Sequence, residues 1–201
     1  MPYLLLMRHG QSTYNLENRF TGELDVPLSP LGIEEAAKAA IKLKDYPVDV
    51  AYTSKLQRAI DTLQIILKSR NQNRIEVIET EALNERNYGV LQGLNKSDII
   101  KQYGEARVLE WRRSFYVAPP GGESLKDTSD RVMPFFNSVV RETLKKNKHV
   151  LIVAHGNSLR AILKELDALD DKAIADVEIR TGEIYAYGFE PRSGVFSKIA
   201  F

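Results

Sequence analysis

The chain has 201 residues, of which 43% are hydrophobic and 27% charged, a composition that is typical of one globular domain and excludes global disorder. Its 28 Lys and Arg residues against 27 Asp and Glu residues give a net charge of +1, which excludes a general affinity for nucleic acids or anionic membranes. The absence of Cys excludes disulfide bonds, thiolate nucleophiles and metal sites built on Cys.

The first half of the chain alternates between strand and helix signals. Apolar runs at residues 3–7, 48–52 and 75–78 predict three strands. Ser29-Pro30 places a capping hydroxyl before a proline at the first helical position, which predicts the start of a helix. Ser54 is predicted to cap a second helix that runs to about residue 69. The faces expected to point inward carry Ile33, Ala36, Ala37, Ala40 and Ile41 in the first helix, and Ile60, Leu63, Ile66 and Leu67 in the second.

The second half continues this alternation. A capping box at residues 124–127 predicts a helix to about residue 146, in which Pro134 is expected to introduce a kink. Residues 150–154 form the clearest buried strand, and a helix from Ser158 to about Leu169 should follow it. The closing strands are predicted at residues 184–189 and 195–199.

Strands separated by helices predict an α/β fold in three layers, a mostly parallel sheet with helices on both faces. We expect residues 1–201 to form a single domain, in which a loop-rich insert at about residues 83–123 covers the active site. Ligands of such sheets bind outside the carboxyl ends of the strands. The loops after the first strand and after residues 150–154 are therefore the candidates for a functional site.

Two of the three histidines lie in these loops. His9 follows the first strand, His155 follows the strand at residues 150–154, and each precedes a glycine. A single histidine at such a position more often satisfies a local hydrogen bond, but two in matching positions favour an active site in which the rings meet. The third, His149, lies among lysines and is expected on the solvated surface.

Cationic side chains could hold a small anion beside these histidines. Arg8 directly follows a buried strand, where an unpaired charge would be costly. Guanidinium groups bind phosphate and carboxylate through paired hydrogen bonds. The further candidates, each of which could instead form a surface ion pair, are Arg58, Arg112, Arg113 and Lys96.

Several other chemistries lack their motifs. The sequence has no P-loop, no Gly-x-Gly-x-x-Gly turn and no His-Glu-x-x-His pair, and residues 156–159 lack the second glycine of a nucleophile elbow. Two histidines without a carboxylate cluster make a weak metal site, so we predict none. Phosphate chemistry in which a histidine attacks remains. No run approaches the ~18 apolar residues of a membrane span, and the first apolar run is too short for a signal peptide, so a cytoplasmic protein is expected.

The segment Leu6-Met7-Arg8-His9-Gly10 resembles the signature of the histidine phosphatase superfamily. Seven further segments, in the same order, resemble its 2,3-bisphosphoglycerate-dependent phosphoglycerate mutase branch, and the match spans about residues 4–189. The segments at 83–89, 91–96 and 111–115 are the most specific. The seven segments are residues 18–22, 53–59, 83–89, 91–96, 111–115, 122–125 and 154–160.

This resemblance implies interconversion of 3-phosphoglycerate and 2-phosphoglycerate in glycolysis and gluconeogenesis, with 2,3-bisphosphoglycerate as primer and no metal. His9 would carry the phosphoryl group, its other ring N–H held by a backbone carbonyl, that of Gly10, and Glu85 would be the general acid and base. The other catalytic residues implied are His155, Arg8 and Arg58. The implied substrate-binding residues are Asn15, Thr21, Gly22, Tyr88, Lys96, Arg112, Arg113, Gly156 and Asn157.

The sequence departs from the family in four places. Gln11 replaces a usual Glu and Tyr14 a usual Trp, neither at a core catalytic position. Residues 119–122 lack a stretch found in longer members, and the chain ends at Phe201 without their longer tail. A pocket more open to water would favour hydrolysis, so a histidine phosphatase acting on a small phosphate ester is the alternative function. A catalytically silent binding protein is a third hypothesis, and either a homodimer or a monomer is compatible with the sequence.

Overall fold

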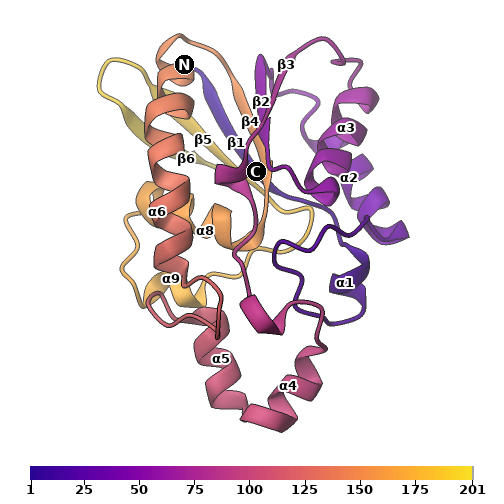
Figure 1. Ribbon diagram of the computed structural model, residues 1–201. Coiled ribbons are helices and arrows are strands. Elements are labelled where there is room, and N and C mark those ends of the chain that lie inside the picture. The colour runs from indigo at the N-terminus through magenta and orange to yellow at the C-terminus, as the bar shows by residue number, and fades with distance from the viewer. Residues whose placement is uncertain (201) are drawn as a thin grey trace.

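The computed structural model of the protein describes residues 1–200 and contains a six-stranded sheet in the order β3-β2-β4-β1-β5-β6 (Figure 1). The first four strands in this order are parallel, whereas β5 and β6 are antiparallel to their neighbours. The predicted mostly parallel α/β sheet is therefore confirmed, and the predicted domain boundary at Phe201 lies outside the described residues. The strands are β1 (Tyr3–Arg8), β2 (Val50–Thr53), β3 (Glu76–Glu79), β4 (Val150–Ala154), β5 (Ile184–Glu190) and β6 (Val195–Ile199).

Helices cover both faces of this sheet (Figure 1). They are α1 (Thr13–Leu16), α2 (Pro30–Lys42), α3 (Gln57–Ser69), α4 (Lys96–Tyr103), α5 (Glu105–Arg113), α6 (Leu125–Phe135), α7 (Arg141–Lys145), α8 (Gly156–Leu166) and α9 (Ala173–Asp176), with 3-10 turns η1 (Glu81–Leu83) and η2 (Gly89–Leu91) and a π-helical segment η3 (Phe136–Val140). Successive strand side chains point to opposite faces. Leu4 and Leu6 of β1 therefore pack with α6 and α8, whereas Leu5 and Met7 pack with α2 and α3.

The register between β1 and β4 brings the two candidate loops together. Arg8, the last residue of β1, pairs with Ala154, the last residue of β4. The next residues are His9 and His155, and the N–H of His9 donates to the carbonyl oxygen of Ala154 (3.0 Å). The prediction that these histidines meet at the carboxyl edge of the sheet is confirmed.

Three helix predictions need correction. In α2, Ile33 and Ile41 are 50% and 68% exposed and Ala37 is exposed too, because a stripe of small residues that includes Ala39 packs close to α3 and the sheet instead. The helix after β2 begins at Gln57 and Ser54 does not cap it. The helix after β4 begins two residues before Ser158, at Gly156.

The predicted helix from residue 124 to about residue 146 is confirmed as three consecutive segments, α6, η3 and α7. Its capping box is present, since the Ser124 hydroxyl accepts from the N–H of Asp127 and the Asp127 carboxylate accepts from the N–H of Ser124. Pro134 lacks an N–H, and the π-helical segment begins two residues after it. The kink at Pro134 stays a prediction.

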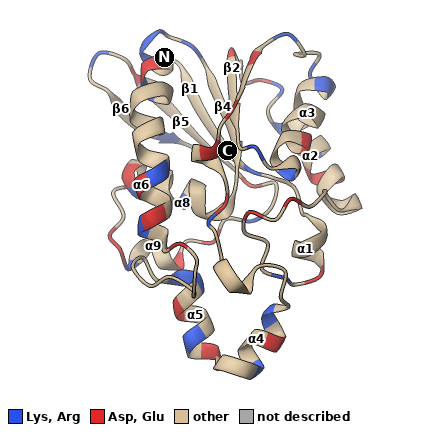
Figure 2. Cartoon of the chain, viewed as in Figure 1, with Lys and Arg blue, Asp and Glu red and all other residues tan. Residues whose placement is uncertain are grey.

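Residues 83–123 lie at the carboxyl end of the sheet and include α4 and α5, which project beyond the main body of the molecule (Figure 1). Lys and Arg occur together with Asp and Glu on α4, α5 and α6, so neither sign dominates these helices (Figure 2). The expectation for His149 was wrong. The residue is half-buried, and its ring centroid lies 5.2 Å from that of Tyr3. Its Nδ1 accepts a hydrogen bond from the Tyr3 N–H (3.1 Å).

Candidate active site

His9 is the first residue after β1 and is buried, with 2% of its surface exposed. Its Nδ1 lies 2.6 Å from the carbonyl oxygen of Gly10. A carbonyl oxygen only accepts hydrogen bonds, so Nδ1 carries the ring proton and Nε2 keeps its lone pair. The predicted hydrogen bond to the Gly10 carbonyl is therefore confirmed.

Close backbone packing fixes the loop that carries His9. A Cβ atom at Gly10 would lie 2.2 Å from the carbonyl oxygen of Gly32, and one at Gly32 would lie 2.1 Å from that of Gln11. Only glycine permits this approach. The N–H of Gly10 also donates to Thr62 Oγ1 on α3 (3.0 Å), so the loop is held between α2 and α3.

His155 is the N-cap residue of α8 and is fully buried. Its ring centroid lies 4.9 Å from that of His9. His155 Nε2 lies 2.7 Å from Ser54 Oγ, which also accepts a hydrogen bond from the N–H of Leu56 (3.2 Å). Ser54 therefore holds the ring of the second histidine rather than capping α3.

The pKa values of both histidines lie well below the ordinary value of the side chain. Burial is the largest cause for each, and the positive charges of Arg58 and Arg8 add to it. Removing an imidazolium from water and placing it beside fixed cations disfavours the charged form. Both rings are consequently neutral near pH 7, which is the state that a nucleophilic ring nitrogen requires.

Two guanidinium groups lie close to these rings. Arg58 is 1% exposed, and its Nη1 and Nη2 donate to the carbonyl oxygens of Leu24 (2.9 Å) and Gly22 (2.7 Å). Arg8 Nη1 donates to the carbonyl oxygen of Ile179 (2.7 Å). Burial lowers the pKa of Arg58 to about 10, so its guanidinium stays charged at neutral pH.

Within residues 1–200, five buried side-chain nitrogens make no hydrogen bond: Arg8 Nε, Arg58 Nε and His155 Nδ1, and Nε and Nη1 of Arg86. An unsatisfied buried donor costs about 1–3 kcal/mol. A phosphoryl group offers several acceptor oxygens, and charge-assisted hydrogen bonds to it are stronger than neutral ones. The donor set therefore fits a phosphoryl group.

Glu85 is buried at the end of the segment that follows η1, with 8% of its surface exposed. Its Oε1 accepts three hydrogen bonds, from the N–H of Arg86 (2.7 Å) and from the backbone N–H and Nδ2 of Asn157 (3.2 and 3.0 Å). Its Oε2 lies 3.8 Å from the position that a Cβ would take at Gly156. One oxygen is thus fixed by donors, while the other faces the N-terminus of α8.

These residues surround a cavity of two adjoining lobes, which share Arg8, Glu85, Tyr88 and Lys96. The first lobe has a volume of about 60 Å³ and the second a volume of about 160 Å³. The first lobe is also lined by His9, Asn15, Arg19, Phe20, Thr21, Gly22 and Arg58. The second is also lined by Arg112, Arg113, Gly156, Asn157, Arg160, Glu178 and Ile179.

The second lobe is strongly cationic. Burial and the charge of Arg112 lower the pKa of Lys96, and burial and the charge of Arg113 lower the pKa of Arg160 to about 10. Arg160 Nη1 donates to Asn157 Oδ1 (3.0 Å), which fixes the orientation of that amide. Several cations held close together repel one another, so the lobe is suited to an anionic group.

Tyr88 lies at the boundary between the lobes. Burial raises its pKa, but the charge of Arg86 and hydrogen bonds from Arg86 and Asn157 outweigh this, so the net pKa is lowered. Its hydroxyl accepts from Arg86 Nη2 (2.9 Å) and from Asn157 Nδ2 (3.4 Å). The Arg86 guanidinium also lies 4.6 Å from the centroid of the Tyr88 ring.

The structure brings together the residues predicted from the sequence. Each of them lines at least one of the two lobes except His155, whose ring centroid lies 4.9 Å from that of His9. Thr21 and Gly22 line the first lobe, with His9, rather than the lobe of Arg112 and Arg113.

Sequence reasoning missed several contributors. Ser54 was assigned to a helix cap, and Thr62 gave no signal because the contact with Gly10 spans 52 positions. Arg160 lies three residues after Asn157 on a helix, which places both side chains on one face and was a usable signal. Arg86 directly follows Glu85 and is fully buried, which no local pattern indicates.

Within residues 1–200, no three His, Asp or Glu side chains are grouped so that they could hold a metal ion. No helix in the same range is both long and apolar enough to cross a membrane.

Comparison with known proteins gives a consistent result. The sequence profile of the histidine phosphatase superfamily (branch 1) matches residues 4–200. A 2,3-bisphosphoglycerate-dependent phosphoglycerate mutase of Cytophaga hutchinsonii is 50% identical, over 96% of this chain and 90% of that protein. The protein of the same name from Parvibaculum lavamentivorans is 49% identical, over 98% of this chain and 96% of that protein. Among solved structures, a mycobacterial glucosyl-3-phosphoglycerate phosphatase superposes with a TM-score of 0.86 at 27% identity, over 100% of this chain and 98% of that one.

Proposed function

The chain belongs to branch 1 of the histidine phosphatase superfamily, and we propose that it interconverts 3-phosphoglycerate and 2-phosphoglycerate as a 2,3-bisphosphoglycerate-dependent phosphoglycerate mutase. Relatives that are 48–50% identical over nearly the whole chain carry that name. The observation that carries the proposal is the two-lobed cavity. A nucleophilic histidine lines one lobe, a cluster of cations lines the other, and Glu85 reaches both.

His9 is the nucleophile. Its Nε2 is unprotonated, because Nδ1–H is held by the carbonyl of Gly10 and the pKa of the ring is low. The unpaired N–H groups of Arg8 and Arg58 bind the phosphoryl oxygens and stabilise the charge of the transition state. When bound, 2,3-bisphosphoglycerate supplies the phosphoryl group with which His9 begins.

His155 acts beside His9. The hydroxyl of Ser54 accepts from the Leu56 N–H, and we assign its own proton to a hydrogen bond with His155 Nε2, which places the ring proton of His155 on Nδ1. This N–H has no partner in the described part of the chain and adds a third donor for the phosphoryl group. Asn15 and the N–H of Gly156 complete the proposed set around the transferred group.

Glu85 moves the proton. The 2-hydroxyl of 3-phosphoglycerate attacks the phosphorus on His9, the P–N bond breaks, its electron pair returns to Nε2, and Glu85 takes the hydroxyl proton. The bisphosphorylated product turns in the site, Nε2 attacks its 3-phosphoryl group, and Glu85 returns the proton to the departing oxygen. Both transfers need the carboxylate at the boundary of the lobes, which is where Glu85 lies.

The second lobe holds the end of the substrate that is not reacting. Arg112, Arg113 and Lys96 supply positive charge, and Asn157 and Tyr88 supply hydrogen bonds. A mutase must retain the bisphosphorylated intermediate long enough for it to turn, which requires a second anion site. In this proposal Thr21 and Gly22 bind the substrate from the first lobe, and residues 83–123 form the covering insert of a single domain.

The proposal includes chemistry without a metal, because fixed guanidinium groups provide the charge stabilisation. We further propose that the enzyme is cytoplasmic and acts on a small-molecule substrate as a monomer or homodimer.

A phosphatase acting on a small phosphate ester is the second candidate. The similarity to the mycobacterial phosphatase over the whole chain supports it. Hydrolysis needs only the first lobe, so the cationic second lobe favours the mutase.

The test is isomerisation of 3-phosphoglycerate with and without 2,3-bisphosphoglycerate, each in the presence of EDTA. The proposal predicts 2-phosphoglycerate formation that is stimulated by the bisphosphate and unaffected by the chelator. If only inorganic phosphate appears and the bisphosphate starts no isomerisation, the phosphatase is the correct function. Loss of isomerisation in EDTA would contradict the metal-free mechanism.

A further inference from the structure

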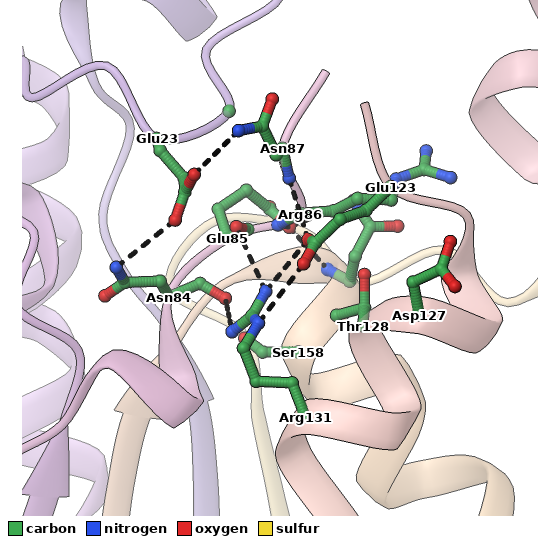
Figure 3. Close-up of polar contacts among 12 residues, drawn as sticks. Glu23, Asn84, Glu85, Arg86, Asn87, Glu123, Asp127, Thr128, Arg131 and Ser158 are labelled. Carbon is green, nitrogen blue, oxygen red and sulfur yellow. Dashed lines mark hydrogen bonds and ion pairs between the residues drawn. The ribbon is translucent and has the colours of Figure 1, made fainter. Parts of the chain in front are cut away.

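The segment that carries Glu85 belongs to no helix or strand. It follows the short turn η1, and of the carbonyls at residues 81, 82, 84 and 85 that of Glu81 accepts a backbone hydrogen bond, from the N–H of Asn84 (2.9 Å). A general acid placed on irregular backbone needs its position fixed by surrounding groups. Figure 3 shows that side chains from other elements converge on this segment.

Arg131 on α6 supplies most of these contacts. Its Nη1 donates to the carbonyl oxygens of Glu81 (3.0 Å), Ala82 (3.0 Å) and Asn84 (3.2 Å), and its Nη2 approaches that of Glu85 (3.5 Å). One guanidinium thus caps the end of η1 and continues to the backbone of the proposed general acid (Figure 3).

Glu123 fixes Arg131 from the other side. Its Oε1 accepts from Arg131 Nε (3.3 Å) and its Oε2 from Nη2 (3.0 Å), a two-point pairing. The same Oε2 accepts from the N–H of Asn87 (3.0 Å), and the N–H of Glu123 donates to the carbonyl oxygen of Asn87 (2.8 Å). The Arg131–Glu123 pair therefore forms hydrogen bonds with the backbone before Glu85, at residues 81–84, and after it, at Asn87.

We propose that Arg131, oriented by Glu123, is a positioning residue that sets the location of the Glu85 carboxyl between the two lobes of the cavity. This inference rests on the proposed function, because it concerns the proton transfers assigned to Glu85. Arg131 lines neither lobe, so it acts through Glu85 and does not touch substrate.

Charge alone is the competing explanation. The positive charge of Arg131 also contributes to the lowered pKa of His155, behind burial and the charges of Arg58, His9 and Arg8. A lysine at position 131 would keep the charge, but its three N–H donors lie on one nitrogen, so it cannot pair with both carboxylate oxygens of Glu123 and also reach the carbonyls of residues 81–85. Arg131→Lys therefore separates positioning from charge.

The experiment measures kcat and KM for isomerisation in Arg131→Met, Arg131→Lys and Glu123→Gln. We expect kcat to fall about 10- to 100-fold in both Arg131 variants, because a displacement of about 1 Å costs that much, while KM changes less than about twofold. Glu123→Gln keeps the shape of the side chain and should lose about 3- to 10-fold in kcat. Full activity in Arg131→Lys would overturn the proposal.

A double-mutant cycle with Glu85→Gln identifies the route of the effect. If Arg131 acts through the Glu85 carboxyl, Arg131→Met should change the residual rate of the Glu85→Gln enzyme by less than about twofold. A loss of equal size in both backgrounds would show that Arg131 only maintains the fold. In all four enzymes of the cycle, the rate measured is the formation of acid-labile phosphohistidine from labelled 2,3-bisphosphoglycerate.

Arg70 offers a matched control. Like Arg131, it donates to backbone carbonyls of another segment, those of Leu43 and Tyr46, but it lies outside the cavity. Arg70→Met should lower the melting temperature and leave kcat per folded molecule unchanged. A fall in kcat that matches Arg131→Met would overturn the proposal.

The reaction products of the wild-type enzyme show whether a failure concerns the role of Arg131 or the proposed mutase function. If the wild type releases only phosphate from 3-phosphoglycerate, the mutase proposal fails, and the same cycle is run on phosphate release. That reaction also needs a proton on the departing alkoxide, so non-additivity between positions 131 and 85 would still support the inference, and additivity would overturn it.

Discussion

The two lobes of the cavity are built in different ways. The first lobe rests on the ends of β1 and β4, and both His9, which lines it, and the neighbouring His155 are neutral, buried and held by backbone and hydroxyl groups. The second lobe draws Lys96, Arg112 and Arg113 from helices outside the sheet, and these side chains are half-buried and cationic. The rigid lobe is suited to forming a bond to phosphorus, and the charged lobe to holding a ligand that has to turn.

This difference explains how one scaffold can serve two reactions. Attack by a histidine and hydrolysis need only the first lobe, whereas isomerisation needs both. Changes in the first lobe should therefore affect every reaction of the protein, and changes in the second should affect isomerisation selectively.

The largest effect is expected for His9→Ala. The variant lacks the attacking nitrogen, so isomerisation and phosphohistidine formation should both fall by at least about 10⁴-fold. Labelling with 2,3-bisphosphoglycerate followed by acid treatment measures the second, and circular dichroism checks the fold. If His9→Ala still acquires an acid-labile label, the nucleophile is another residue, and the first lobe is not the site of phosphoryl attack.

The two lobes also differ in how far the sequence predicts them. The strands, their order of appearance and the meeting of His9 with His155 follow from apolar runs and from the rule that parallel strands share a carboxyl edge. For the second lobe, the sequence names Lys96, Arg112 and Arg113 as candidate cations, but their grouping with Asn157 was accessible only through the family resemblance, because no periodic pattern brings these segments together.

The failures have physical causes. Ile33 and Ile41 were expected in the core by their hydrophobicity, but close packing of α2 selected the small side chains instead. Ser54 has the chemistry of a helix cap and uses its hydroxyl for a histidine 101 positions away. A hydrogen bond over such a separation leaves no local signal.

Acid should lower the free energy of unfolding through the two buried histidines at the first lobe. The pKa values of His9 and His155 in the folded state lie below the unfolded value, so the unfolded chain binds more protons as the pH falls. Their stabilisation is fully present above about pH 6.5, the pKa of histidine in the unfolded chain, and decreases as the pH falls, by at most about 1.4 kcal/mol per histidine at pH 5.5.

Thermal unfolding between pH 8 and pH 5.5 measures this loss, which should appear as a decrease of up to about 10 °C in the melting temperature. His155→Asn should remove about half of the pH dependence. A melting temperature that stays constant over this range would show that the histidines are not held neutral.

Arg113→Ala should distinguish the lobes most directly. A charged hydrogen bond to an anion contributes about 1.5–3 kcal/mol, so isomerisation should fall about 10- to 100-fold. Release of phosphate from 3-phosphoglycerate should change less than about threefold, because the first lobe is intact. Parallel assays of both reactions on one preparation measure the ratio. Equal losses would contradict the assignment of Arg113 to the second lobe's function.

The smallest effect is expected for Ser54→Ala, which tests whether the first lobe depends on the hydroxyl that holds His155. The substitution leaves His155 Nε2 without its partner at 2.7 Å, and we expect isomerisation and phosphohistidine formation to fall together by about 5- to 10-fold. Thr53→Val is the matched control, because it removes a neighbouring buried hydroxyl that bonds only the carbonyl oxygen of Val153 (2.8 Å). Both variants should lose about 1 kcal/mol of stability, and only Ser54→Ala should lose activity per folded molecule. If the two variants lose activity equally, Ser54 only stabilises the fold, and the ring of His155 needs no hydroxyl to be held for catalysis.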